Sequence, residues 1–529
     1  MPVGYWCLVL HAHLPYVRHP EHPLFLEENW FFEALTDSYV PLLMALDRLE
    51  GDGVDFRLTM SLSATLVSMM RDPLLVGRYE RHLESLVKLA RREVERTLRE
   101  APQFRGLAGM YLRRFEEVRR VFQEAYRSDL PAGFRRHRDA GRLELLASAA
   151  THGLLPLLTP VPGTVRAQVL VGVAHYRSAW GREPKGFWLP ECGYQPGIET
   201  FLREAGLRYS FLETHGLTHA HPRPTQGAFA PIVSPGGVVF LGRDPESSRE
   251  VWSAEAGYPG DPEYREFYRD AGWDLPPSEV DGFLGGGPRR SLGIKYHRVT
   301  GKVDLAAKEP YRPDRAASRA AAHARDFVEK RCRQVQRAVS AGARQPPLVV
   351  SPYDAELFGH WWFEGPAFLE NVFRELQGCR HLLAATTPGE FLELYPVCEE
   401  AQPVGSSWGA GGHMDFWLNP QTDWMYVHLD GAGERMAELA RRFSDPDRLT
   451  RRALDQAARE LLLAQASDWA FMLRKGTTVE YAGRRVRDHL ARFNRLYRSL
   501  TEDGVQEAVL GDIERLDAVF PEIDYRLFG

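Results

Sequence analysis

Two acidic side chains each stand at the end of a short apolar run. Residues 187–189 (FWL) lead to Glu191 and then to a Gly- and Pro-rich turn, and residues 348–353 lead to Asp354 and then to an aromatic cluster. An apolar run that ends in an acid before a turn is typical of a buried strand that delivers a carboxylate to the mouth of a sheet. Two such carboxylates, bracketed by aromatic residues, predict acid/base or nucleophilic chemistry on a flat, hydroxylated substrate.

Several further apolar runs indicate the elements that must position these acids. Strands are expected over 5–10, 56–61, 142–147, 187–189, 208–212, 238–242 and 348–353, with helices between them, the first of these over 29–48. This alternation predicts a parallel sheet, either doubly wound or closed into a barrel. His11, His152, Glu191 and Asp354 all fall at the carboxyl ends of predicted strands. Barrel enzymes keep their chemistry at that end, so the coincidence favours a barrel.

Three stretches depart from the alternating pattern. Apolar residues recur at helical spacing amid dense Arg and Glu over 76–140, which predicts a helical insertion. Residues 232–310 have a loop-like composition, and a connection of that length is typical of a lid or a substrate-binding wall. Beyond about residue 400 the pattern is helical again. There Leu454, Leu461 and Asp468 are spaced seven apart, so Asp468 is expected to face inward.

Composition narrows the class of protein. The chain has 529 residues, which is too long for a single hydrophobic core, so more than one domain is expected. Its net charge is −5, and it has no long block of charges of one sign. Nucleic acid and anionic membranes are therefore not the expected partners. Five scattered cysteines indicate reduced thiols and a cytosolic location. The 12 tryptophans, many of them in Gly- and Pro-rich segments, favour a surface that stacks on sugar rings.

The residues alone leave three functions open. Glu191 and Asp354 could be a glycosidase pair, one of them a nucleophile and the other a general acid/base. His11, His13 and a carboxylate could instead hold a metal ion that activates water. The histidine pair is weak evidence for a metal, because residues i and i+2 share a face in any strand. In the third interpretation all of these residues are structural, and the protein is a non-catalytic carbohydrate-binding scaffold.

Five stretches carry a resemblance to a known family. HAHLPY (11–16), ELLASAATHG (144–153), WLPECGY (188–194), SPYDAELFGHWW (351–362) and SSWGAGGHMDFWLN (406–419) resemble, in order and spacing, the five signatures of glycoside hydrolase family 57. Within that family they are most similar to 1,4-α-glucan branching enzymes. The resemblance implies an incomplete (β/α)7 barrel over 1–75 and 141–399, a helical insertion domain over 76–140, and a C-terminal α-helical domain over 400–529.

The resemblance also implies roles for individual residues. Glu191 matches the catalytic nucleophile and Asp354 the general acid/base. The implied substrate-binding set comprises His11, His13, His152, Trp188 and Trp362 around the reacting sugar, Trp30, Trp273, Trp408 and Trp417 along the glucan cleft, and Arg243 and Asp468. No metal or cofactor is implied, and the implied partner is an α-glucan such as amylose, amylopectin or glycogen.

The choice among reactions stays open at this stage. Family members that are α-amylases or 4-α-glucanotransferases share the catalytic pair. Branching enzymes of the family carry a mobile loop with a tyrosine at its tip, which favours transfer over hydrolysis. No tyrosine occurs between Tyr209 and Tyr258 in this chain. Branch length and oligomeric state are not encoded in any pattern of the sequence.

Overall fold

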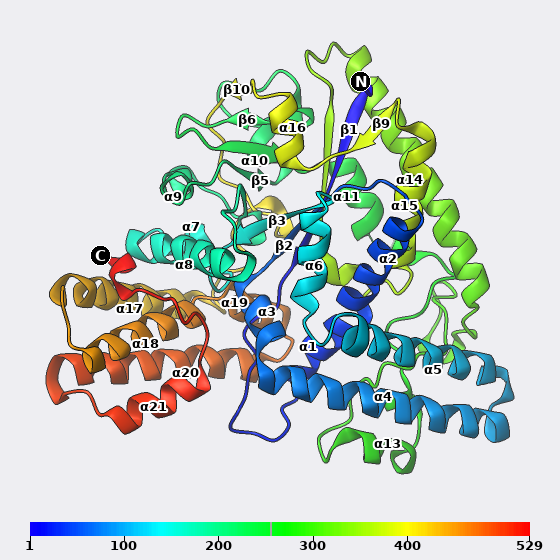
Figure 1. The fold of residues 1–529 in the computed structure, drawn as a ribbon, viewed down its shortest axis with the longest axis horizontal. Coiled ribbons are helices and arrows are strands. Elements are labelled where there is room, and N and C mark those ends of the chain that lie inside the picture. The colour runs from blue at the N-terminus through cyan, green and yellow to red at the C-terminus, as the bar shows by residue number, and fades with distance from the viewer. Residues whose placement is uncertain (254–256) are drawn as a thin grey trace.

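A sheet of ten strands lies at the centre of the computed structural model, which describes residues 1–253 and 257–529 (Figure 1). The strand order is β10-β6-β7-β5-β4-β3-β2-β1-β8, with β9 also paired to β1. From β8 round to β7, neighbouring strands pair in parallel. These parallel strands are β1 (Gly4–Ala12), β2 (Leu58–Leu62), β3 (Leu143–Ser148), β4 (Gly186–Trp188), β5 (Tyr209–Leu212), β7 (Val239–Gly242) and β8 (Leu348–Asp354).

The two ends of this parallel run meet at one point. Arg243, just after β7, forms an isolated parallel bridge with Val350 of β8, and the backbone N–H of Asp244 donates to the Val350 carbonyl at 2.8 Å. A single bridge in place of a full ladder leaves the barrel incompletely closed. The expected α/β fold with an incomplete barrel is therefore confirmed. The short strands β6 (Ile232–Val233), β9 (Leu383–Ala385) and β10 (Glu399–Glu400) were not predicted.

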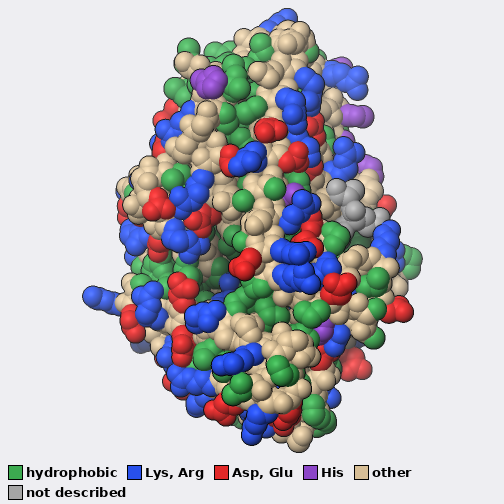
Figure 2. Space-filling view, turned by 90° about the vertical axis from the view of Figure 1, so that its right-hand side faces the viewer, with side chains coloured by type: hydrophobic (Ala, Val, Ile, Leu, Met, Phe, Trp, Pro, Cys, Tyr) green, Lys and Arg blue, Asp and Glu red, His purple; other side chains and the backbone are tan. Residues whose placement is uncertain are grey.

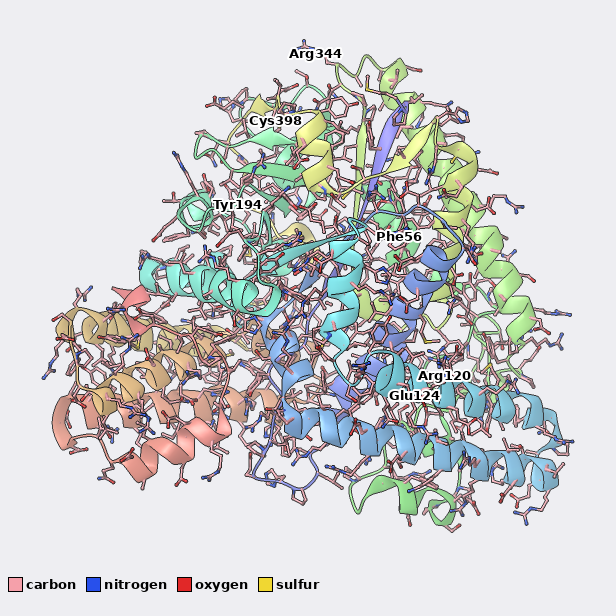
Figure 3. All side chains as sticks on the ribbon, viewed as in Figure 1. Phe56, Arg120, Glu124, Tyr194, Arg344 and Cys398 are labelled. Atoms are coloured by element: carbon pink, nitrogen blue, oxygen red, sulfur yellow. The ribbon has the colours of Figure 1, made fainter. Side chains whose placement is uncertain are left out.

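The strands are buried on both faces, as β1 illustrates, since every one of its residues is buried. This is why parallel strands appear in a sequence as continuous apolar runs. Helices cover the outside of the sheet. Phe56, labelled in Figure 3, has its ring 5.9 Å from that of His137 and 5.7 Å from that of Phe373. The helices on this side are α2 (Val40–Gly51), α6 (Leu130–Asp139) and α15 (Gly365–Leu376), with α8 (Pro162–Trp180) and α14 (Pro313–Ser340) elsewhere around the barrel.

Residues 73–120 form a helical hairpin beside the barrel (Figure 1). It consists of α4 (Pro73–Glu100) and α5 (Arg105–Arg120), and it follows the short helix α3 (Ala64–Arg71). Asp72 caps α4 by accepting from the backbone N–H of Leu75. The hairpin is tied to a distant segment, because the Tyr111 hydroxyl donates to the carbonyl of Lys295 at 2.8 Å.

The segment 232–310 is less loop-like than predicted. It contains α11 (Pro245–Trp252), α12 (Ala271–Asp274) and α13 (Pro277–Leu284). Asp244 begins α11, because its carboxylate accepts from the N–H of Ser247 at 2.7 Å and Pro245 fits the first turn. Part of the segment that was expected to act as a lid, residues 254–256, lies outside the described residues.

The C-terminal region is helical, as expected, but its first α-helix begins at Asp423 and not near residue 400. Its helices are α17 (Asp423–Arg442), α18 (Arg448–Ala464), α19 (Ser467–Lys475), α20 (Val479–Arg498) and α21 (Glu507–Leu516). The prediction that Leu454, Leu461 and Asp468 share one face of a single helix was wrong. Helix α18 ends at Ala464, and Asp468 lies on the next helix, α19.

Charges of both signs are interspersed over the face shown in Figure 2. Within the part of the chain that the structure describes, no helix combines the length and the apolar character that crossing a bilayer requires.

Candidate active site

A cavity of about 260 Å³ opens at the carboxyl ends of the strands. It brings together seven of the predicted site residues, namely His11, His13, His152, Glu191, Asp354, Trp408 and Asp468. Its other lining residues are Trp252, Glu356, Leu357, Trp361 and Phe471. A larger cavity of about 570 Å³ lies between residues 23–32, α4 and residues 282–290, and neither strand-end carboxylate lines it. The smaller of these two cavities is therefore the candidate active site, because it contains the acid pair.

Glu191 follows β4 on a strained backbone. Its φ and ψ are 58° and 22°, the left-handed region that residues with a Cβ rarely adopt. His152 also has a positive φ of 60°. Such conformations cost on the order of 1–3 kcal/mol and cluster at functional sites. The carbonyl of Glu191 accepts from the backbone N–H of Trp408 at 2.9 Å, which fixes the turn.

Two donors hold the carboxylate of Glu191. The indole Nε1 of Trp408 donates to Oε2 at 2.7 Å, and the hydroxyl of Ser467 donates to Oε1 at 3.0 Å. Burial raises the pKa of Glu191 to about 7, and these two hydrogen bonds act in the opposite direction. Glu191 is thus a buried acid whose ionised form is specifically supported.

Asp354 has different surroundings. It is the last residue of β8 and stands in register with His11 of β1. Burial raises its pKa well above the usual range, and the charges of Glu356 and Glu191 raise it further, while Arg243 lowers it. This setting favours the protonated form of Asp354. It differs from the setting of Glu191, whose ionised form is supported by two hydrogen bonds, as a division into acid and nucleophile requires.

A row of stacked histidines forms one wall of the cavity. The Nε2 atoms of His11 and His152 lie 2.9 Å apart, and His152 Nδ1 lies 2.9 Å from the hydroxyl of Ser467. The ring of His13 stacks on that of His152 with centroids 3.9 Å apart and an angle of 15° between their planes. Burial lowers the pKa of His11 and of His152 well below the usual value, so both rings are neutral. Both ring nitrogens of His152 are already paired, so these neutral rings shape the wall of the cavity without adding charge to it.

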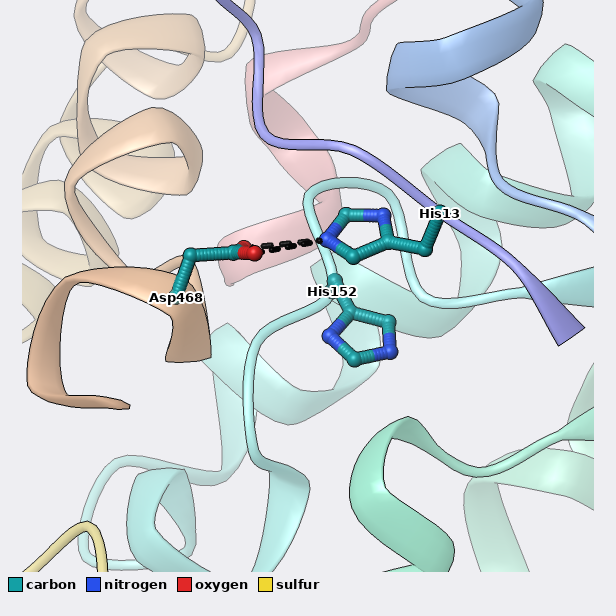
Figure 4. Close-up of side chains that lie close together, drawn as sticks. All are labelled: His13, His152 and Asp468. Carbon is teal, nitrogen blue, oxygen red and sulfur yellow. Dashed lines mark hydrogen bonds and ion pairs between the residues drawn. The ribbon is translucent and has the colours of Figure 1, made fainter. Parts of the chain in front are cut away.

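His13 joins the barrel to the C-terminal helices. Its Nδ1 lies 2.9 Å from the hydroxyl of Ser63, and its Nε2 lies 2.9 Å from Oδ2 of Asp468 on α19 (Figure 4). Donor atoms of His13, His152 and Asp468 all lie within 4.8 Å of one another, the spacing of a possible metal site. However, the lone pairs of an imidazole lie in the plane of its ring. An ion in the plane of the His13 ring would lie outside that of the stacked His152 ring, which does not favour a metal.

The six predicted tryptophans differ in their distance from the cavity. Trp408 lines the cavity and bonds to Glu191. Trp188 is buried behind the cavity, where it stacks on His11 at 4.8 Å and fixes that ring. Trp30 is half-buried against Tyr481, and Trp273 is exposed on α12; neither is among the residues that line the cavity.

Three of the predicted aromatic contacts are corrected. Trp188 is 0% exposed, and Trp362 and Trp417 are each only 1% exposed, so none of them can stack on a sugar. Trp362 packs against Phe368 in the core, while its neighbour Trp361 lines the cavity. The ring of Trp417 packs beside Gly409, where a Cβ would come within 2.5 Å of it.

Arg243 influences the site through another residue, Trp408. Its Nη1 donates to Oε2 of Glu213 at 2.8 Å, and its guanidinium carbon lies 5.6 Å from the ring centre of Trp408. This cation–π contact and the ion pair fix the ring that in turn bonds to Glu191. Arg243 therefore positions Trp408, and it is not among the residues that line the cavity.

Six lining or bonding residues were not predicted: Trp252, Glu356, Leu357, Trp361, Phe471 and Ser467. Glu356 and Ser467 each had a signal, since one lies two residues from Asp354 and the other directly precedes Asp468. Trp252 had no such signal beyond its side-chain type, because it follows a polar stretch that does not indicate a site residue. It ends α11 and makes an edge contact with Trp408 at 6.2 Å.

An acid pair in a cavity rimmed by aromatic rings, at the carboxyl end of a parallel barrel, defines an enzyme that acts on glycosidic bonds. Residues 7–401 match the family model for glycosyl hydrolase family 57, and residues 428–528 match the model for the C-terminal region of 1,4-α-glucan branching enzymes. The chain belongs to glycosyl hydrolase family 57.

Named relatives fall in two activity classes. A 1,4-α-glucan branching enzyme of Thermococcus kodakarensis is 35% identical over 94% of this chain and 74% of its own. Among solved structures, the α-amylase AmyC of Thermotoga maritima is 42% identical, with a TM-score of 0.93 over 99% of both chains. A family 57 branching enzyme of Pyrococcus horikoshii is 33% identical, with a TM-score of 0.89 over 99% of this chain and 97% of that one.

Proposed function

We propose that this chain is a 1,4-α-glucan branching enzyme, with Glu191 as nucleophile and Asp354 as general acid/base. The match of residues 428–528 to the branching-enzyme C-terminal region carries the choice of reaction. The different surroundings of Glu191 and Asp354 support their assignment as nucleophile and general acid/base. Hydrogen bonds from Trp408 and Ser467 support an ionised Glu191, whereas burial and the acidic neighbours of Asp354 raise its pKa and favour its protonated form.

In the first step, the Glu191 carboxylate attacks C1 of a glucose within an α-1,4 chain. The C1–O4 bond breaks as Asp354 gives its proton to O4, and the leaving chain departs with a new 4-hydroxyl. The donor chain is then held as an ester on Glu191 with inverted configuration at C1. His11, His13 and His152 are assigned to the wall of the subsite that holds this sugar.

In the second step, the 6-hydroxyl of another glucan unit attacks C1. Asp354, now a carboxylate, accepts the hydroxyl proton, and the bond to Glu191 breaks, which restores the α configuration as an α-1,6 link. A sugar hydroxyl must outcompete water for this to happen. Holding the acceptor in the right position and excluding water from the cavity provides that advantage.

Hydrolysis is the second candidate, favoured by the likeness to the α-amylase of Thermotoga maritima. The two reactions separate when the protein is incubated with amylose and both iodine staining and reducing ends are followed. Branching predicts loss of stain with few new reducing ends and with new links that isoamylase cleaves. A rise in reducing ends that matches the loss of stain would instead identify an amylase.

The proposal also covers the substrate and the cellular location of the enzyme. The partner is an α-glucan of the amylose, amylopectin or glycogen type, and the catalytic steps above use side chains alone. Five cysteines that form no disulfide among the described residues fit a reducing compartment, and we place the protein in the cytoplasm.

A further inference from the structure

Three aromatic rings lead away from the active-site cavity. Trp361 lines the cavity and is 56% exposed. The ring of Phe267 stacks on it, with centroids 4.5 Å apart and an angle of 23° between the planes. Tyr268 meets Phe267 edge to face at 5.3 Å and is 70% exposed. None of these three residues belongs to the catalytic pair or to the substrate-binding set expected from the sequence.

Large aromatic side chains at this exposure need an explanation, since clustered apolar surface is typical of a binding site. We propose that Trp361, Phe267 and Tyr268 form an aromatic rail that binds an α-glucan chain outside the catalytic cavity. The ligand is inferred to be the glucan itself, because Trp361 lines the cavity where the glucan reacts and the other two rings continue from it. This inference rests on the proposed function and adds a distal subsite to it.

The loop that presents Trp361 is held rigidly. Trp362 is buried in the core, and the N–H of Gly359 donates to its carbonyl at 2.8 Å. Gly359 has a φ of 118°, and a Cβ there would meet the carbonyl oxygen of Asp37 at 1.9 Å. The N–H of His360 also donates to the Ser38 hydroxyl at 3.1 Å. The turn therefore forces adjacent tryptophans to opposite sides, one into the core and one into the cavity.

The other end of the rail is anchored as well. The ammonium of Lys295 donates to the carbonyl of Phe267 at 2.6 Å and lies 5.1 Å from the centre of its ring. The N–H of Glu266 donates to the carbonyl of His297 at 2.9 Å, and the N–H of Arg269 donates to the Glu266 carboxylate at 2.6 Å. Backbone contacts thus hold the segment on both sides of the aromatic pair.

This rigidity suits a polysaccharide. The C–H faces of glucose rings are apolar and stack on aromatic rings, while the hydroxyls remain in water. A preformed platform loses little conformational freedom when the chain binds. The geometry also orders the three residues: Trp361 touches sugars next to the reaction centre, Phe267 supports it, and Tyr268 touches only a chain long enough to leave the cavity.

The test uses the full-length chain with Glu191→Gln, so that bound glucan is not consumed, and compares maltotriose with maltoheptaose by calorimetry. Adding Tyr268→Ala should lower the affinity for maltoheptaose by about three- to tenfold and leave the affinity for maltotriose unchanged. Adding Trp361→Ala should lower the affinity for both sugars. The control is Leu394→Ala, which removes a side chain of similar exposure (58%) from the end of α16 (Pro388–Leu394).

Two failures are distinguishable. If the Glu191→Gln parent binds both sugars and the Tyr268→Ala and Trp361→Ala variants behave like Leu394→Ala, the rail alone is overturned. If the parent binds neither sugar and the native protein leaves amylose unchanged, the proposed function fails and the rail with it. Circular dichroism on each variant shows whether the fold is intact, and Tyr268→Phe, which keeps the ring, should retain the affinity for maltoheptaose.

Discussion

The indole N–H of Trp408 donates to the carboxylate of Glu191 at 2.7 Å, across 217 residues of sequence. This bond favours the ionised acid, while burial favours the neutral one and raises the pKa to about 7. Catalysis as proposed needs Glu191 ionised, so activity should fall as the pH drops through this pKa. It needs Asp354 protonated, so activity should also fall as the pH rises through the raised pKa of Asp354. A bell-shaped profile is expected.

Replacing Trp408 by phenylalanine tests this bond. Trp408→Phe keeps an aromatic ring and removes the donor, so the pKa of Glu191 should rise and the acidic limb should move to higher pH. A lost hydrogen bond to a charged group is worth about 1.5–3 kcal/mol, or roughly one to two pH units. The measurement is kcat/KM on amylose against pH. Trp252→Phe is the control, since Trp252 lines the same cavity and its acidic limb should stay in place. An unmoved limb in Trp408→Phe would contradict the assignment.

Replacing Glu191 itself separates binding from chemistry. Glu191→Gln has the same shape and can still accept from Trp408, but it cannot form the ester, so turnover of amylose should fall on the order of 10⁴-fold or more. Affinity for maltoheptaose, measured by calorimetry, should be retained. Substantial turnover by this variant would show that another group is the nucleophile.

The barrel could be read from the sequence because parallel strands are buried on both faces. The run 348–353, for example, was predicted within one residue of β8. The short strands β6, β9 and β10 have only two or three residues, too few to show a pattern. α11 was missed because its Gly- and Pro-rich setting resembles a loop, although Asp244 and Pro245 together are a helix start signal.

The acid pair was predictable for a topological reason: the carboxyl ends of parallel strands meet at one edge of the sheet. The contacts around it were not. Ser467 reaches Glu191 from 276 residues away, and no local pattern encodes that distance. The sequence also could not decide which of Trp361 and Trp362 lines the cavity. That choice depends on the turn at Gly359 and on the packing of Trp362 against distant side chains.

Glu356 should control the basic limb of the pH profile. Its charge is, after burial, the largest influence that raises the pKa of Asp354. Glu356→Gln removes that charge while its amide oxygen can still accept from the N–H of His13. The pKa of Asp354 should then fall, and the basic limb should move to lower pH by roughly one unit. The pH dependence of kcat/KM measures this shift. A basic limb that stays in place would exclude this role for Glu356.

Chelation tests the remaining metal hypothesis. The stacked rings of His13 and His152 do not direct their lone pairs to a common point, so activity on amylose should be unchanged after prolonged dialysis against EDTA. Added zinc should likewise have no stimulating effect. Loss of activity on dialysis, with recovery on adding a single metal ion, would overturn this expectation.

A buried ion pair near the start of α4 should contribute strongly to stability. Arg78 donates to the carboxylate of Glu28, which is 1% exposed, and also to the carbonyl of His19 at 3.2 Å. Arg78→Met leaves that carboxylate buried without its partner and should lower the free energy of unfolding by about 3–5 kcal/mol. Arg91→Met, on the same helix, breaks an exposed pair with Glu116 and should cost only about 0–1 kcal/mol. Urea unfolding followed by circular dichroism compares the two variants, and equal losses would show that the buried pair has no special weight.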